Sequence, residues 1–170
     1  AMLKDLFPAL EDNEIAILSS HLDRHDGTRG SVLMELGNEG RDMFLVENGT
    51  CEVYQMFSMA GQVFALRVAH LEAPLMLGEA NLLMGDKRNA AVVVSSDECV
   101  YYCMTHENFE KIKKDYPEMA IKILEQISIE VTRRFFGLQE NLQKKMLSEL
   151  PTPQAGITYL RKYVGDVHVC

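Results

Sequence analysis

The stretch LMLGEANLLMGDKRNAAVVV, residues 75–94, places a Gly-Glu pair, a short apolar segment and one arginine between two apolar runs. A buried strand followed by a turn requires neither Glu79 nor Arg88. Gly78 permits backbone conformations that other residues avoid, and EANLLM can form one helical turn whose N–H groups face an anion. Arg88 offers a planar fork that suits phosphate oxygens. These features indicate a sugar-phosphate site, and the alternative is a surface ion pair between Glu79 and Arg88.

The composition of the whole chain narrows the function classes. The 170 residues carry a net charge of −8, which argues against a broad surface for nucleic acid or membrane but allows one small anion at a local arginine. No apolar run approaches the length that spans a bilayer, and no signal-peptide pattern is seen. The cysteines, Cys51, Cys99, Cys103 and Cys170, form no Cys-x-x-Cys pair and indicate free thiols. We therefore expect one acidic, cytoplasmic domain.

From Gly27 to about Cys103 the chain is a series of short apolar runs separated by turn residues. The runs are SVLMEL (31–36), MFLVE (43–47), TCEVYQMF (50–57), QVFALRVAHL (62–71) and AAVVV (90–94). Short strands with Gly- or Asn-bearing turns are typical of an antiparallel sandwich or barrel. The Asn48-Gly49 pair predicts a hairpin between the runs on either side of it.

Helical patterns flank this region. A short helix is predicted after Asp12-Asn13, and Thr105 is a candidate N-cap for a helix that follows it. Pro117 begins a helix that can run to about Leu147. Its apolar residues, Leu124, Ile127, Val131, Phe135, Leu138 and Leu142, repeat close to a heptad. This stripe either packs back on the β region or forms a two-stranded homodimer, and its length favours the homodimer.

The order of these elements, together with GEANLLMGDKRNAAVVV, resembles the cyclic nucleotide-binding domain family, which includes the sensor domain of catabolite-activator-like regulators and the regulatory domains of cyclic-nucleotide-dependent kinases. The likeness covers about residues 6–147, and the phosphate-binding cassette matches at Gly78, Glu79, Leu82, Leu83, Arg88, Ala90 and Val92. The stretch MFLVENGTCEV, residues 43–53, resembles the strand–Gly–strand hairpin that is usual in this family. The resemblance implies a mainly β fold, an antiparallel jelly-roll barrel with short helices over residues 3–117. A long helix over 118–150 would act as lid and dimerisation element, and 151–170 would be linker and tail.

The resemblance also implies roles for residues. Glu79 would accept the ribose 2′-hydroxyl and Arg88 would contact the exocyclic phosphate oxygens. The expected ligand-binding residues are Gly78, Glu79, Ala80, Asn81, Arg88, Asn89 and Ala90. A base contact is expected from the long helix between Arg133 and Gln139.

Two cassette positions depart from the family pattern. Asn81 stands where a small residue is usual, and it can crowd the phosphate or add a hydrogen bond. Asn89 stands where alanine, serine or threonine usually follows the arginine, so the base preference does not follow from the pattern.

The sequence thus predicts a regulatory sensor that binds cAMP or cGMP and signals by repositioning its C-terminal helix. The alternative is a dimerisation or interaction module of the same fold with an empty pocket or another effector. A barrel enzyme of the cupin type needs a His-rich metal cluster, and His21 with His25 lacks an obvious third ligand. We therefore expect no catalytic residue, no metal and no cofactor apart from the cyclic nucleotide. Nucleic acid and membrane are not expected partners.

Overall fold

The computed structural model describes residues 2–149, and the chain divides after residue 126 into two units, which are taken separately. The predicted linker and tail, 151–170, lie outside the described residues. Within residues 2–149, no helix is long and apolar enough to cross a membrane.

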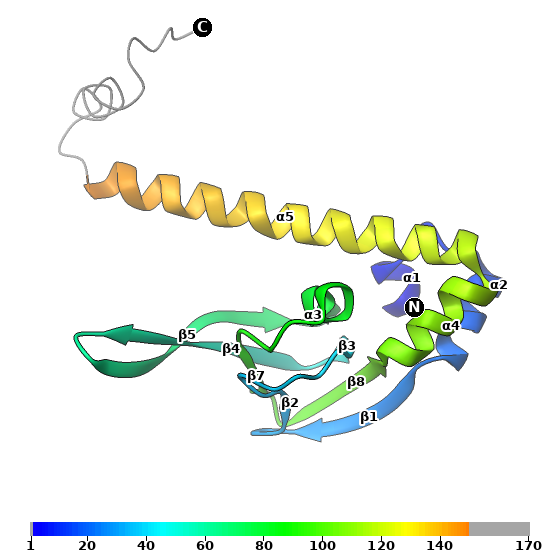
Figure 1. Ribbon diagram of the computed structural model, residues 1–170, viewed down its shortest axis with the longest axis horizontal. Coiled ribbons are helices and arrows are strands. Elements are labelled where there is room, and N and C mark those ends of the chain that lie inside the picture. The colour runs from blue at the N-terminus through cyan, green and yellow to red at the C-terminus, as the bar shows by residue number, and fades with distance from the viewer. Residues whose placement is uncertain (1, 150–170) are drawn as a thin grey trace, which may run out of the picture. The chain divides into compact units, whose positions relative to one another are not determined.

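The first unit is built on two antiparallel sheets (Figure 1), each four-stranded within the described residues. One has the order β1 (Asp23–Thr28), β8 (Glu98–Met104), β3 (Met43–Asn48) and β6 (Leu75–Leu77). The other has the order β2 (Val32–Met34), β7 (Ala91–Val94), β4 (Thr50–Met59) and β5 (Gln62–Glu72). The chain passes repeatedly between the two sheets, as in a jelly roll. The predicted fold, mainly antiparallel β with a long C-terminal helix, is confirmed.

Helices lie before, between and after the strands, and the sequence predicts most of them from local signals. α1 (Met2–Leu6) and α2 (Asp12–Ser20) precede the strands, and α3 (Glu79–Met84) interrupts them. The Thr105 hydroxyl accepts a hydrogen bond from the Asn108 N–H at 3.1 Å, which confirms it as the N-cap of α4 (His106–Asp115). α5 (Pro117–Glu149) begins at the predicted proline.

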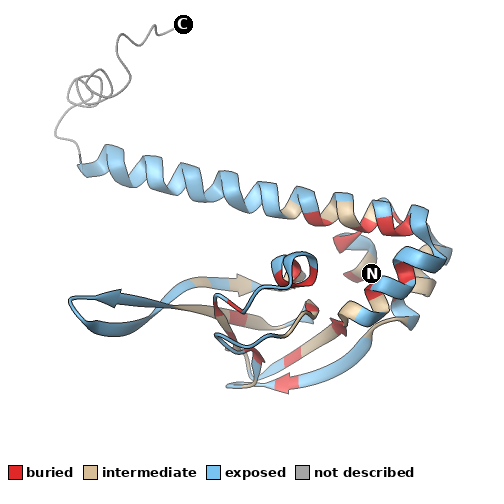
Figure 2. Cartoon of the chain, in the orientation of Figure 1, coloured by how far each residue is buried: buried red, intermediate tan, exposed pale blue. Residues whose placement is uncertain are grey.

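One hydrophobic core cluster draws its members from both sheets, and Figure 2 shows buried positions on their strands. Its buried members are Leu33, Met34, Val46, Cys51, Leu77, Val92, Val94 and Cys99. Leu77 directly precedes α3, and Val92 follows Arg88 on β7. Burial of these side chains therefore anchors both ends of the segment that carries the predicted cassette.

The predicted hairpin at Asn48-Gly49 is wrong. β3 pairs with β6 and β8, whereas β4 pairs with β5 and β7, so the chain changes sheets at this point. Gly49 has a φ of +105°, and a Cβ there would lie 2.6 Å from the Ser96 Oγ. An Asn-Gly pair predicts a backbone with positive φ, and such a conformation also occurs where the chain passes from one sheet to the other. The strand–Gly–strand hairpin expected from the family is thereby corrected as well.

The hairpin of the second sheet joins β4 and β5. Met59 pairs with Gln62, and the turn contains Ala60 and Gly61, both at positive φ. The outer part of this hairpin is apolar and exposed, with Phe57 and Phe64 directly opposite each other.

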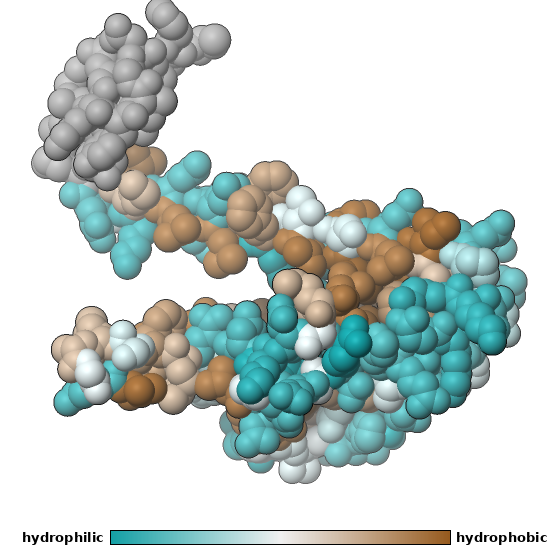
Figure 3. All heavy atoms as spheres, in the orientation of Figure 1, coloured by the Kyte–Doolittle hydropathy of each residue, from teal (hydrophilic) through white to brown (hydrophobic). Residues whose placement is uncertain are grey.

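In the second unit, the described residues form the distal part of α5. Exposed apolar side chains run along it (Figure 3). They are Ile129, Val131, Phe135, Phe136, Leu138, Leu142, Met146 and Leu147.

Candidate functional site

The predicted cassette begins where β6 gives way to α3. Gly78 is the N-cap of this helix at a φ of +78°, and Gly85 ends it at a φ of +74°. The Gly85 N–H donates to the Asn81 carbonyl at 2.9 Å, which closes the helix in a left-handed cap. The segment EANLLM is thus a short helix, as its sequence predicts.

Arg88 is fixed by contacts to its backbone and its side chain. Its N–H donates to the Asn38 carbonyl at 2.8 Å. Nη1 donates to the Asn81 Oδ1 at 2.9 Å, and Nη2 donates to the backbone carbonyl of Asp42 at 2.6 Å. The Arg88 Cζ lies 5.7 Å from the centroid of the Phe44 ring. Both hydrogen-bond acceptors of the guanidinium are neutral oxygens.

The cassette charges are buried. Arg88 is 5% exposed and Glu79 is 8% exposed, so the alternative of a surface ion pair between them does not hold. Burial lowers the pKa of Arg88, and the nearby carboxylate of Asp42 opposes this shift. Within the described residues Arg88 makes no salt bridge. A buried charge without a salt-bridge partner costs stability, and an anion at this point would lower that cost.

Glycines confine the guanidinium. A Cβ at Gly78 would lie 2.7 Å from the Arg88 Nη1 and 2.9 Å from the Asp42 carbonyl oxygen. A Cβ at Gly40 would lie 3.3 Å from the Arg88 Nη2. Both positions therefore accommodate the arginine because they lack a side chain.

Arg41 and Asp42 are site residues that the sequence analysis missed. Arg41 lies over the end of α3, where a Cβ at Gly85 would be 3.0 Å from its Nε. This Nε is buried and has no hydrogen-bond partner. Asp42 acts on Arg88 through a backbone carbonyl 46 residues away in sequence, and no residue type signals such a contact.

The structure brings only part of the predicted set together. Gly78, Asn81 and Arg88 are in direct contact. Glu79 lies buried at the start of α3. Of the other three predicted residues, Ala80 is exposed on α3, Asn89 is exposed after Arg88, and Ala90 is buried.

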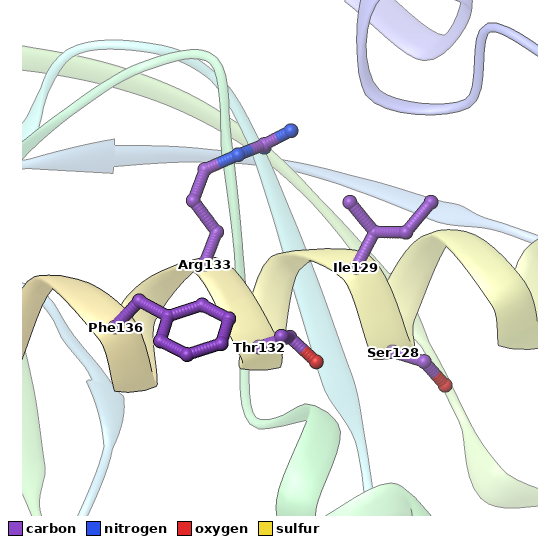
Figure 4. Close-up of a pocket in the computed structure, with 5 residues that line it drawn as sticks. All are labelled: Ser128, Ile129, Thr132, Arg133 and Phe136. Atoms are coloured by element: carbon purple, nitrogen blue, oxygen red, sulfur yellow. The ribbon is translucent and has the colours of Figure 1, made fainter. Parts of the chain in front are cut away.

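The predicted base-contact residues, Arg133 and Gln139, are exposed on α5 in the second unit. Arg133 pairs with Glu130 one turn earlier. Figure 4 shows Arg133 and Ile129 on one side of the helix, and the Ser128 and Thr132 hydroxyls on the other. Together with Phe136 they line an open hollow of about 430 Å³.

The histidines and cysteines that the sequence singles out make contacts within the protein fold. The His21 Nδ1 lies 2.9 Å from the Ile17 carbonyl, and the His25 ring stacks on Tyr101 at 5.2 Å. Among the described residues no group of three or more His, Cys, Asp and Glu is placed to hold a metal ion. Cys99 and Cys103 are buried free thiols, as predicted.

The chain is similar to proteins of known family and structure. The family model for the cyclic nucleotide-binding domain matches residues 27–116. A cyclic nucleotide-binding domain from Methylobacillus flagellatus is 20% identical with a TM-score of 0.74, and the match covers 80% of this chain and 74% of that one. No curated protein sequence matches.

Two further solved structures belong to larger proteins. The Thermus thermophilus Catabolite Activator Protein is 22% identical with a TM-score of 0.65, over 84% of this chain and 62% of that chain. The regulatory domain of Toxoplasma gondii PKA, crystallised with cAMP, is 17% identical with a TM-score of 0.61, over 80% and 48%. At these identities the likenesses show the fold.

Proposed function

Since this chain belongs to the cyclic nucleotide-binding domain family, a family of regulatory sensors, we propose that it binds cAMP or cGMP at the cassette of residues 78–90. The observation that carries the proposal is Arg88, whose guanidinium is buried and bonded to neutral oxygens. A cyclic phosphate would supply the missing negative charge. Glu79 would accept the ribose 2′-hydroxyl, and backbone groups at Ala80, Asn89 and Ala90 would complete the cradle.

The test is calorimetric titration of cAMP and cGMP into the wild-type chain and into Arg88→Leu. Loss of the charged partner of a buried anion costs several kcal/mol, so affinity should fall at least about 100-fold. Arg29→Leu is the matched control, because Arg29 is exposed and pairs with Asp97 at the surface. It should bind as the wild type does. Equal affinity in Arg88→Leu would refute the role of the cassette.

A folding check accompanies this titration. Arg88→Lys keeps the charge but loses the planar fork, and its affinity should lie between those of the wild type and Arg88→Leu. Far-ultraviolet circular dichroism should show the same strand and helix content in all variants. A loss of binding that merely follows a loss of structure would be recognised in this way.

The ligand signal is proposed to pass through α5. Arg133 and Gln139 are the proposed base contacts, and their alanine variants should change the ratio of cAMP to cGMP affinity more than either affinity alone. Repositioning of α5 should alter the hydrogen exchange of residues 117–149 on addition of ligand. Unchanged exchange in a ligand-saturated protein would exclude this output.

The proposed assembly is a homodimer through the stripe on α5. Val131, Phe135, Leu138 and Leu142 are exposed and recur at steps of four and three residues, the spacing of a coiled-coil seam. Sedimentation should give twice the chain mass of 19.2 kDa. The double variant Leu138→Glu with Leu142→Glu should be monomeric, because like charges would face each other across the seam. Gln143→Glu, outside the stripe, should remain dimeric.

One observation favours a second candidate function. Both Nη atoms of Arg88 already donate to protein oxygens, which is compatible with an interaction module whose pocket stays empty or takes another effector. A folded, dimeric wild type that gives no heat with either nucleotide would support this second candidate.

A further inference from the structure

Asn81 is the cassette residue whose side chain contacts Arg88. It is 6% exposed, and its Oδ1 accepts from the Arg88 Nη1 at 2.9 Å. Its Nδ2 donates to the Asp86 carbonyl at 2.7 Å. Because the oxygen meets a donor and the nitrogen meets an acceptor, the two partners fix the orientation of the amide.

The amide also ties two parts of the cassette together. Asn81 belongs to α3, whereas Asp86 and Arg88 lie in the segment that follows it. The Asn81–Asp86 bond therefore holds this segment against the helix, and the Asn81–Arg88 bond sets the direction of the guanidinium. The Arg88 guanidinium also lies close to Gly78 and Gly40, where a Cβ would be 2.7 Å and 3.3 Å from its Nη atoms.

We propose that Asn81 is a positioning residue that orients the Arg88 guanidinium for the phosphate of the ligand through a neutral contact, without forming a salt bridge to it. The inference rests on the proposed function. A carboxylate of nearly the same shape at position 81 would form a salt bridge and cancel the charge, whereas an amide supplies an acceptor and no charge. The second acceptor, the Asp42 carbonyl, is neutral as well. The remaining N–H groups of Arg88 are left to donate to phosphate oxygens.

The first test compares Asn81→Ala and Asn81→Asp in titrations with cAMP and cGMP. Asn81→Ala should weaken binding by about 10- to 100-fold, since a charged donor loses its fixed direction. Asn81→Asp keeps an acceptor for Arg88 but adds a charge that repels the phosphate, so it should bind more weakly still. Both variants also remove the Nδ2 donor to the Asp86 carbonyl, so a purely structural role of that bond predicts equal losses.

A matched ligand and a matched background make this test specific. Adenosine and guanosine lack the phosphate, so their affinities should be equal in the wild type and in Asn81→Ala. An equal loss for nucleoside and cyclic nucleotide would overturn the proposal. In an Arg88→Lys background, Asn81→Ala should cause little further loss, since an ammonium has no fork to orient.

A second measurement separates failure of this inference from failure of the proposed function. In nitrogen-15 NMR spectra of the ligand-free protein, the Nη protons of Arg88 should rotate and exchange slowly in the wild type and rapidly in Asn81→Ala. Absence of these signals from Arg88→Lys assigns them. Equal rates would refute the positioning role whether or not the chain binds a cyclic nucleotide. Slow rates with no binding by the wild type would refute the proposed function, and the inference with it.

Discussion

Alanine at position 78 is the perturbation that the structure defines most sharply. A non-glycine residue at a φ of +78° costs about 1–2 kcal/mol in backbone strain. The new Cβ would also lie 2.7 Å from the Arg88 Nη1 and 2.9 Å from the Asp42 carbonyl oxygen. The guanidinium and the backbone at Asp42, directly before β3, must therefore shift. Overpacking of this kind costs about 1–3 kcal/mol. The free energy of unfolding of Gly78→Ala should therefore fall by about 2–5 kcal/mol.

Gly61→Ala is the control for the backbone part of this cost. Gly61 has a φ of +76° in the turn between β4 and β5, and nothing lies within 4 Å of a Cβ placed there. It should lose only the strain of about 1–2 kcal/mol. The difference between the two variants isolates the contact with Arg88 and Asp42.

Urea unfolding at equilibrium measures both values, and unchanged m-values would show that the comparison is sound. Titration with cAMP and cGMP then connects packing to the site. Gly78→Ala should bind weakly because the guanidinium is displaced, whereas Gly61→Ala should bind as the wild type does. If both variants lose equal stability and retain equal affinity, the close approach of Gly78 to Arg88 has no energetic meaning and the reasoning fails.

Three further predictions concern single groups. Glu79→Gln should lower affinity for cAMP about 10- to 100-fold but leave binding of 2′-deoxy-cAMP nearly unchanged; equal losses in calorimetry would remove Glu79 from the ribose. The hydrogen bonds from Lys122, at 2.8 and 2.9 Å, lower the pKa of Glu14. Its contribution to stability is therefore present above about pH 4.5 and is lost as the pH falls through the lowered pKa; Glu14→Gln should flatten this acid limb in urea midpoints, and an unchanged limb would contradict the assignment. Burial, and then the neighbouring Cys99, raise the pKa of the Cys51 thiol to about 12. In a Cys170→Ser background, iodoacetamide should therefore label Cys51 only on unfolding, as mass spectrometry would detect, and labelling of the native protein would contradict its burial.

The parts of the fold that the sequence predicts are those with a local physical cause. Thr105 caps α4 and Pro117 begins α5, because a hydroxyl acceptor and a preset φ act within one helical turn. β3 and β7 are found for a similar reason, since their buried apolar residues leave a pattern in the sequence itself.

The missed elements lack such a cause. β1 reads DRHDGT, and only Gly27 of its six residues is buried. It is a strand because it pairs along β8 at the edge of its sheet, and that contact joins residues distant in sequence. β6, with three residues, is too short to show a period. The same limit explains the error at Asn48-Gly49, because a turn signal specifies a backbone conformation and not the sheet that the next strand joins.

The candidate site divides along the same line. Glu79 and Arg88 were selected by residue type, since a carboxylate and a guanidinium near a glycine suggest a sugar phosphate. Asp42 could not be selected, because every residue has a backbone carbonyl. Asn81 is expected from the family resemblance as a ligand-binding residue and departs from the family pattern, and two distances, 2.9 Å to Arg88 and 2.7 Å to Asp86, reveal what it contacts.

These two distances also bear on why a larger residue is tolerated at position 81. A small residue there would leave the Arg88 Nη1 without this acceptor inside a buried site, and an unsatisfied charged donor costs at least about 1–3 kcal/mol. The asparagine removes that cost without removing the charge, so the guanidinium remains costly to bury until a counter-charge arrives. Any anion that bonds the remaining N–H groups lowers this cost and thereby stabilises the folded state, by an amount that grows with the logarithm of its concentration above its Kd. Asn81 is therefore compatible with a functional cassette. It accepts a hydrogen bond from Arg88 without adding a negative charge, so the phosphate of the ligand can still form the salt bridge.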